Sequence, residues 1–395
     1  MSSSISAQSR RGRRSAAAAV ALAALAGLVA SGIAAAQPAA AESRDRALQS
    51  RLESMVKAGH APGVLASVRD RKGHITNYTA GVGNLRTKAK VPVDGYVRIA
   101  SNTKMYTAVV VLQLVGEGRI GLDTPVEEYL PGLVRGKGID GRKITIRQLL
   151  QHTSLLPNYD LLPNGILQDR HTFREDHDLL QSGLTTEERP DPGVKFSYSN
   201  TNYILAGLVV QKVTGRPIGE EITNRIIRRV GLRHTYWPGE GDQTVRGAHP
   251  RGYVTDPATD KLVDITELDP SMAGAAGRLV ATPSDVNRFM VALQDGRLLK
   301  APQLAEMRKS VPAENDLLPG WRYGLGAFQI PLSCGGSAWG HGGDMDGYQS
   351  RTGVTADGRA VTIVLTRDEL TSLEALNDPL AALDAALCAG KPSRR

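Results

Sequence analysis

The segment RIASNTKMYTAVVVLQLV, residues 98–115, places a serine and a lysine three positions apart, just ahead of an apolar run. Residues three apart share one face of a helix, and unpaired N–H groups at a helix start stabilise a developing negative charge. The run VVVLQLV predicts burial, which draws Lys104 inward, lowers its pKa and lets it act as a base. Ser101 is thus a candidate nucleophile with Lys104 as its base. For this tetrad alone, a helix cap beside a surface lysine is the better interpretation.

The same spacing occurs a second time, at Ser54 and Lys57 in the segment SMVK. A chain of this length and composition contains about one such tetrad by accident. Ser54 falls inside a polar, amphipathic helix predicted over residues 43–58, where nothing shelters it. We therefore expect no chemistry at Ser54.

A tyrosine and an asparagine stand two positions apart in KFSYSNTNYILAG, just before a predicted helix. In an extended segment the side chains of Tyr198 and Asn200 project to one side. A phenol near a lysine ammonium is biased towards phenolate and can pass on a proton, and an amide can hold a substrate carbonyl. A turn that caps the following helix is an equally good interpretation.

A histidine followed by two glycines stands in the segment WGHGGDMDGYQSRTGV. Gly342 and Gly343 on a sheet edge would let a peptide-like substrate lie along the strand. A backbone N–H there can complete an oxyanion hole with that of Ser101. A glycine-rich hairpin with a structural His341 is the common alternative.

The order of the predicted elements indicates how these segments meet. A hairpin over residues 64–69 and 75–80 comes first, helices follow, and a strand at 360–365 and a helix at 371–388 come last. This order predicts an α+β fold whose antiparallel sheet is built from both chain termini and flanked by helices, with an all-helical lobe inserted. Residues 157–195 are polar, broken by prolines, and predicted to be irregular.

The first 41 residues have the features of a signal peptide, with four arginines followed by an uncharged, alanine-rich stretch over residues 15–36. We expect export, with a cut near Ala36 or Ala41. An uncleaved leader that tethers the protein to a membrane is the alternative. The folded domain would span residues 42–390, followed by a basic tail, residues 391–395.

Composition limits the partners of the protein. The formal net charge of +8 includes four leader arginines, aromatic residues make up 5% of the chain, and no polybasic stripe is present, so we expect no nucleic-acid partner. No Cys/His spacing suggests a zinc site. In an exported chain, an even count of two cysteines, Cys334 and Cys388, favours one disulfide over two buried thiols.

The three motifs S-x-x-K, Y-x-N and H-x-G, in this order, resemble those of the serine β-lactamase/penicillin-binding-protein superfamily. The chain is similar to the branch with secreted serine DD-carboxypeptidases and class C β-lactamase-like hydrolases. Beyond the motifs, the likeness is carried by the segments AVVVLQLVGEGRIGLDTPVEEYLPGL, TIRQLLQHTS and LSCGGSAWGHGG. It extends over about residues 45 to 390, and the family's cysteine pair falls at Cys334 and Cys388.

The resemblance implies a covalent mechanism that needs no metal and no organic cofactor. Ser101 would attack a carbonyl carbon and form an acyl-enzyme, while Lys104 and Tyr198 manage the proton. Asn200 and His341 would position the substrate.

The resemblance also implies that the strand at Gly342, Gly343 and Asp344 binds the substrate, with the backbone N–H groups of Ser101 and Asp344 as the oxyanion hole. The implied substrate is a small peptide, amide or ester, for example a peptidoglycan stem peptide, and β-lactams would acylate the serine. We expect a monomer.

Two departures from the family pattern put the substrate in doubt. Typical carboxypeptidases of this type have threonine where Gly342 stands, and an arginine for the substrate carboxylate where GLGAFQI offers Phe328. Losing both groups should weaken carboxylate recognition by roughly a few kcal/mol. The leading hypothesis is an exported D-alanyl-D-alanine carboxypeptidase-like acyl hydrolase. The alternatives are an esterase, a class C-like β-lactamase, an amidase that prefers apolar substrates, and a non-catalytic penicillin- or wall-binding sensor.

Overall fold

The computed structural model describes residues 46–159, 162–184, 192–193, 195–313, 318–368 and 373–390. The predicted leader and its cut sites, and the tail at 391–395, lie outside these ranges. The chain divides into two units after Leu48, and the unit from Gln49 onwards holds the fold described below. Within the described ranges, no helix is both long enough and apolar enough to cross a membrane.

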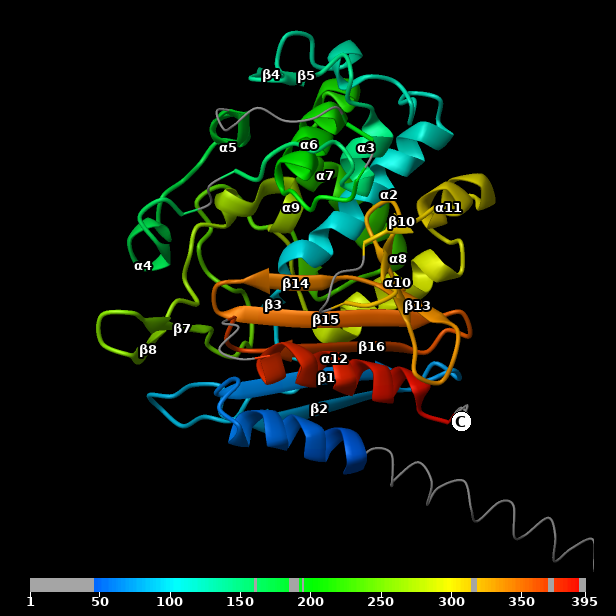
Figure 1. Cartoon of the computed structure of the whole chain (residues 1–395). Coiled ribbons are helices and arrows are strands. Elements are labelled where there is room, and N and C mark those ends of the chain that lie inside the picture. The colour runs from blue at the N-terminus through cyan, green and yellow to red at the C-terminus, as the bar shows by residue number, and fades with distance from the viewer. Residues whose placement is uncertain are drawn as a thin grey trace, which may run out of the picture. The chain divides into compact units, whose positions relative to one another are not determined.

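One antiparallel sheet joins the two ends of this unit, which confirms the predicted α+β fold (Figure 1). Strand β1 (Gly63–Arg69) lies between its hairpin partner β2 (Ile75–Gly81) and β16 (Ala360–Leu365). The register pairs Val64 with Leu365 on the two central strands. The sheet continues through β15 (Tyr348–Thr355), β13 (Ser337–Gly340), β12 (Phe328–Pro331), β11 (Arg322–Tyr323) and β10 (Val311–Pro312), while β14 (Gly342–Met345) pairs with β15.

Helices cover both faces of the sheet. Helix α12 (Leu373–Cys388) crosses β15 and β16 on one face, and α10 (Pro283–Gln294) packs against β1, β15 and β16 on the other (Figure 1). Because both faces are covered, every residue of β15 is buried. The sulfur atoms of Cys334, in the β12–β13 turn, and Cys388, at the end of α12, lie 2.13 Å apart, so the structure carries the expected disulfide.

The inserted lobe is built around α2 (Thr103–Gly116) and α6 (Thr201–Thr214). Only Gln113, Val115 and Gly116 of α2 are not buried, as expected for a helix that is apolar on all sides. Small residues allow close packing here: a Cβ atom on Gly207 of α6 would lie 2.7 Å from the Cβ of Ala275 in the short helix α9 (Gly274–Gly277). Other helical segments of the lobe are the 3₁₀ turns η2 (Val126–Glu128) and η4 (Pro270–Ala273), α3 (Ile146–Gln151), α4 (Ile166–Asp169), α5 (Asp176–Leu184), α7 (Ile218–Ile222), the π-helical η3 (Thr223–Ile227) and α8 (Arg228–Val230).

The lobe differs from the prediction in two respects. It is not all helical, because short strands pair within it: β3 (Val97–Arg98) and β6 (Thr235–Tyr236) flank β9 (Val280–Ala281). Two hairpins also form, one from β4 (Arg135–Gly136) and β5 (Ile139–Asp140) and the other from β7 (Tyr253–Asp256) and β8 (Lys261–Asp264). The excursion at 157–195 is also more regular than expected. Helix α5 forms there because Leu179, Leu180 and Leu184 bury one face between the proline clusters.

Candidate active site

Ser101 lies in a single 3₁₀ turn, η1 (Ala100–Asn102), that leads directly into α2. Ala100 has φ of 45°, a left-handed conformation that costs a non-glycine residue about 1–2 kcal/mol. Asn102, fully buried, holds this turn on the sheet: its Nδ2 donates to Ser350 Oγ at 2.8 Å, and its Oδ1 accepts from Thr352 Oγ1 at 2.8 Å. The nucleophile candidate is therefore fixed by β15 and not only by its own helix.

The Nζ atom of Lys104 lies 2.9 Å from Ser101 Oγ, as the helical spacing predicts. It also donates to Asn200 Oδ1 at 2.7 Å and to the carbonyl of Ala276 at 2.9 Å. A neutral amine has two N–H donors and one lone pair. The two carbonyl oxygens can only accept, so a neutral Lys104 directs its lone pair towards the hydroxyl of Ser101.

Burial makes this neutral form of Lys104 the favoured one. The side chain is 0% exposed, and burial holds its pKa well below the ordinary 10.5, against a smaller opposing effect of the Asp344 carboxylate. None of its three close partners is charged. Lys104 therefore has the geometry of a general base for Ser101, and its lowered pKa favours the neutral amine that this role requires.

Tyr198 approaches the same hydroxyl from the segment before α6, and the interaction of its phenol with Ser101 acts to lower the pKa of the phenol. The Lys104 ammonium position lies 5.0 Å from the centre of the Tyr198 ring. Burial raises the pKa of Tyr198, and the interaction with Ser101 only partly offsets this. Because the phenol stays protonated, it is suited to relay a proton and unsuited to act as a resting phenolate.

The H-x-G motif, residues 341–343, forms the turn before β14 and the first residues of that strand. A Cβ atom on Gly343 would lie 2.3 Å from the carbonyl oxygen of Ile99, so only glycine lets this strand approach the nucleophile turn. Among the described strands β14 pairs with β15 alone. Its other edge is thus open to a substrate backbone, and its N–H groups with that of Ser101 remain the predicted oxyanion hole.

His341 lies behind this edge and not on the cavity wall. Its Nδ1 contacts the carbonyl of Gly342, which can only accept, so Nδ1 carries the proton and Nε2 accepts from the Tyr323 hydroxyl at 3.1 Å. Burial, with the nearby Lys104, lowers the pKa of His341 to about 3. The imidazole is therefore neutral at physiological pH, and its ring centre lies 6.1 Å from that of Tyr198.

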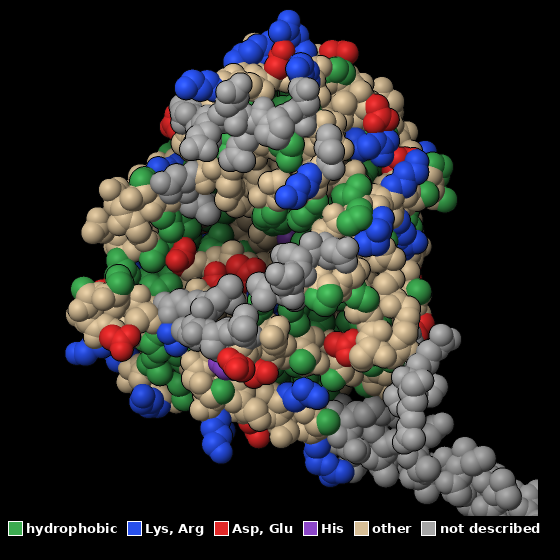
Figure 2. Space-filling model, in the orientation of Figure 1, with side chains coloured by type: hydrophobic (Ala, Val, Ile, Leu, Met, Phe, Trp, Pro, Cys, Tyr) green, Lys and Arg blue, Asp and Glu red, His purple; other side chains and the backbone are tan. Residues whose placement is uncertain are grey.

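A cavity of about 190 Å³ opens beside Ser101 and Asn200. Tyr159, Met272 and Met345 give it an apolar wall. Figure 2 shows acidic side chains gathered at a hollow on this face of the molecule.

The same cavity is lined by three carboxylates, Asp344, Asp346 and Asp368, and by no arginine or lysine among the described residues. The Oδ1 atom of Asp344 accepts from Arg351 Nη1 at 2.6 Å. The cavity thus offers a nucleophile, an apolar surface and a negative rim.

The structure brings together all the residues that the three motifs predicted. Ser101, Asn200 and Asp344 line the cavity, Lys104 and Tyr198 support the serine from within, and His341 lies behind Tyr198. The second tetrad stays apart, since Ser54 is exposed and donates to the Ser50 carbonyl at 2.8 Å.

Three contributors were not identified as site residues from the sequence. The Ala276 carbonyl belongs to no catalytic motif, and Asn102 fills an unspecified position of S-x-x-K. His152, whose ring centre lies 4.2 Å from that of Tyr198, stands in the segment TIRQLLQHTS. For Ala276 no signal exists, because a backbone carbonyl carries no side-chain signature. For Asn102, its place directly after the serine is a usable signal.

Comparison with known proteins agrees with this geometry. A family model described as Beta-lactamase matches residues 48–387. The chain belongs to the Beta-lactamase family. Among curated members it is similar to penicillin-binding protein 4 of Amycolatopsis lactamdurans, with 29% identity over 80% of this chain and 84% of that protein.

Solved structures of the superfamily include two amide hydrolases. A D-stereospecific amidohydrolase from Streptomyces sp. is 39% identical, with a TM-score of 0.75 over 82% of this chain and 94% of the other. A D-amino acid amidase from Ochrobactrum anthropi SV3, solved with L-phenylalanine amide, is 26% identical, with a TM-score of 0.77 over 87% and 98% of the two chains. The protein is thus a serine hydrolase of this superfamily.

Proposed function

We propose that the protein hydrolyses small amides of D-amino acids or short peptides through an acyl-enzyme on Ser101. The observation that carries this choice of substrate is the cavity lining, which has an apolar wall and three carboxylates, and no arginine or lysine among the described residues. A free ammonium group on the substrate is attracted there, whereas the terminal carboxylate of a D-alanyl-D-alanine peptide is repelled. The likeness to two amide hydrolases supports the same choice.

The side chains divide the reaction between them. Ser101 Oγ attacks the amide carbonyl carbon as its proton passes to Lys104 Nζ, 2.9 Å away. The oxyanion that forms is held by the N–H groups of Ser101 and Asp344. The C–N bond then breaks, and the Tyr198 phenol relays the proton from Lys104 to the leaving nitrogen. Water attacks the ester by the same route and releases the acid.

A D-alanyl-D-alanine carboxypeptidase is the second candidate, because one cation does approach the substrate strand. A Cβ atom on Gly342 would lie 3.2 Å from Arg351 Nη1, so this guanidinium lies against the position where typical carboxypeptidases have threonine. Arg351 already donates to Asp344 at 2.6 Å, which neutralises part of its charge. This pairing makes the carboxypeptidase the weaker candidate.

The test compares D-phenylalanine amide with an acylated D-alanyl-D-alanine peptide as substrates of the purified protein. We expect kcat/KM for the amide to exceed that for the peptide by at least about tenfold. The Asp344→Asn variant should show a smaller ratio between the two kcat/KM values. A higher kcat/KM for the peptide would instead establish the carboxypeptidase. Benzylpenicillin with mass spectrometry tests β-lactam binding separately: a stable adduct on Ser101, without turnover of any substrate, would favour the sensor.

We also propose that the protein is exported. The support is the arginine-rich start and alanine-rich stretch of the first 41 residues. The mass of the protein purified from the medium of its producing cells should correspond to a start after Ala36 or Ala41. Recovery of the full-length chain in the membrane fraction would instead indicate the uncleaved tether.

A further inference from the structure

His152 lies at the end of α3, behind the active site, with no exposed surface. Its backbone is left-handed, with φ of 57° and ψ of 38°, a conformation that glycine adopts without strain. A helix end that needed only this turn would be served better by glycine, so the imidazole itself must have a use.

The contacts of His152 surround one residue, Tyr198. The carbonyl of His152 accepts from Ser197 N at 2.8 Å, and its Nδ1 accepts from Ser199 N at 3.2 Å. These two bonds hold the residues directly before and directly after the tyrosine. The imidazole also lies against the Tyr198 ring, with centres 4.2 Å apart and planes at 33°. The segment at 196–199 belongs to no strand or helix. These contacts therefore take the place of the backbone hydrogen bonds that a strand or helix would provide.

The protonation state of the ring is set by its neighbours. Ser199 N can only donate, and Asn202 Nδ2 lies 3.0 Å from the same Nδ1 while its Oδ1 accepts from Ser154 Oγ at 2.5 Å. Nδ1 is therefore an acceptor, and the proton of the neutral imidazole lies on Nε2. Within the described part of the chain Nε2 has no hydrogen-bond partner. Burial, with Lys104 and then His341, holds the pKa of His152 well below 6.5.

We propose that His152 is a positioning residue for the acylation step, which holds the Tyr198 phenol against Ser101 Oγ by clamping both sides of Tyr198 and stacking on its ring. This inference rests on the proposed acyl-enzyme mechanism. The residue touches no substrate, since it is absent from the cavity wall. Replacing His152 should therefore lower kcat for acylation and leave KM nearly unchanged. A general loosening of the fold should instead lower the fraction of protein molecules whose Ser101 can be acylated.

The test measures the acylation rate per competent site, with sites counted by mass spectrometry after labelling with a fluorophosphonate. We expect His152→Ala to lower kcat on the order of 100-fold, the effect of a small misplacement of a proton-transfer group. His152→Asn should recover about tenfold of this loss, because an amide oxygen can accept from Ser199 N and asparagine tolerates the left-handed backbone.

A matched control comes from Phe289, equally buried and stacked on Tyr106 with ring centres 3.7 Å apart. Phe289→Leu should lower Tm without lowering kcat per competent site. Equal kcat in His152→Ala and the parent, or an equal fall in Phe289→Leu, would overturn the proposal. If the parent protein is not acylated at all, the proposed function fails instead. The crystal structure of His152→Ala then decides: an unmoved Tyr198 ring contradicts the positioning role, and a displaced one supports it.

Discussion

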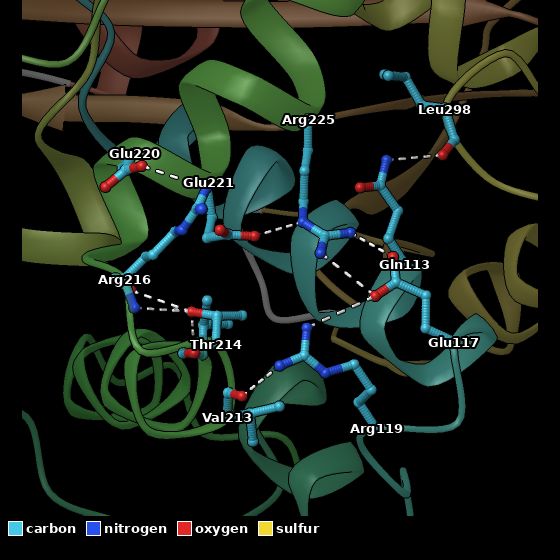
Figure 3. A network of polar contacts seen from close by, with 11 residues as sticks. Gln113, Glu117, Arg119, Val213, Thr214, Arg216, Glu220, Glu221, Arg225 and Leu298 are labelled. Atoms are coloured by element: carbon cyan, nitrogen blue, oxygen red, sulfur yellow. Dashed lines mark hydrogen bonds and ion pairs between the residues drawn. The ribbon is translucent and has the colours of Figure 1, made fainter.

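A basic residue lies near each end of helix α2: Lys104 in its first turn, and Arg225, which comes from η3, beside its last turn. At the second end, the Arg225 guanidinium donates to the carboxylates of Glu117 and Glu221 (Figure 3). The hydrogen bond to Glu117 makes the largest contribution and raises the pKa of Arg225. Burial opposes it, and the hydrogen bond to Glu221 raises the pKa further. A cavity of about 390 Å³ adjoins this network, but Arg225 is already paired there.

The first end lacks such counterions. The close partners of Lys104 are a hydroxyl, a side-chain amide and a backbone carbonyl, and its pKa is lowered where that of Arg225 is raised. Lys104 is fully buried and the Arg225 side chain is 22% exposed, so the two ends differ in burial as well as in counterions. With carboxylate partners a basic group forms a fixed structural ion pair, and with neutral partners it becomes a base.

The largest effect is expected at the nucleophile. Ser101→Ala removes the atom that forms the acyl-enzyme, so amide and ester turnover should fall by about 10⁴-fold or more. Ser54→Ala, in the exposed second tetrad, should change neither kcat nor KM. Steady-state assays on both variants test the assignment, and substantial turnover by Ser101→Ala would place the nucleophile elsewhere.

The next effect concerns Lys104. Lys104→Met should lower the acylation rate by about 10²- to 10⁴-fold, the contribution of a positioned general base. In contrast, Arg225→Met at the other end of α2 should leave the acylation rate within about twofold of the parent. Stopped-flow measurement of the acylation rate in the two variants separates the two roles. A similar fall in the rate of both variants would show that Lys104 and Arg225 do not differ in their role in acylation.

Stability should depend on pH through Lys104. Between its lowered pKa and 10.5 the unfolded chain binds a proton at this lysine that the folded chain does not, so the free energy of unfolding rises with pH in that range. Lys104→Met should remove this component. Urea unfolding at several pH values between 7 and about 10 measures it, and an identical pH dependence in the variant would contradict a neutral Lys104.

The smallest effect is expected from the ion pair at the far end. Arg225→Met leaves Glu221, whose side chain is only 6% exposed, without its cation, and should cost about 1–3 kcal/mol of stability. The Glu117 side chain is 41% exposed, so Glu117→Gln removes a more solvent-screened ion pair and should lower the free energy of unfolding by less. Urea unfolding of both variants measures this order, and the reverse order would show that Glu117 carries the network.

The sequence predicted the elements that depend on local patterns. The capping box of α3 at Thr145 and the β1–β2 hairpin are both set by neighbouring residues, and the hairpin forms where it was predicted. Thr282 caps α10, while Ser284 Oγ donates to Asp94, which is distant in sequence. The short strands of the lobe were missed for the same reason: Val97 pairs with Ala281, and no local pattern signals that contact.

The sequence predicted those residues of the site that belong to a recognisable motif. Ser101, Lys104 and Tyr198 converge as their spacing and the family resemblance suggested. The orientation of the Lys104 amine depends on the Ala276 carbonyl, and the position of Tyr198 depends on His152. Both are tertiary contacts, and neither residue belongs to a motif.

The central claim is that Lys104 is an uncharged amine in the resting protein. The direct measurement is an NMR titration of the Lys104 side chain, assigned by comparison with Lys104→Met. The account predicts that the Lys104 signal has the chemical shift of a neutral amine at pH 8 and does not titrate near 10.5. A signal that stays cationic at pH 8 and titrates near 10.5 would contradict it, because no lone pair would then face Ser101.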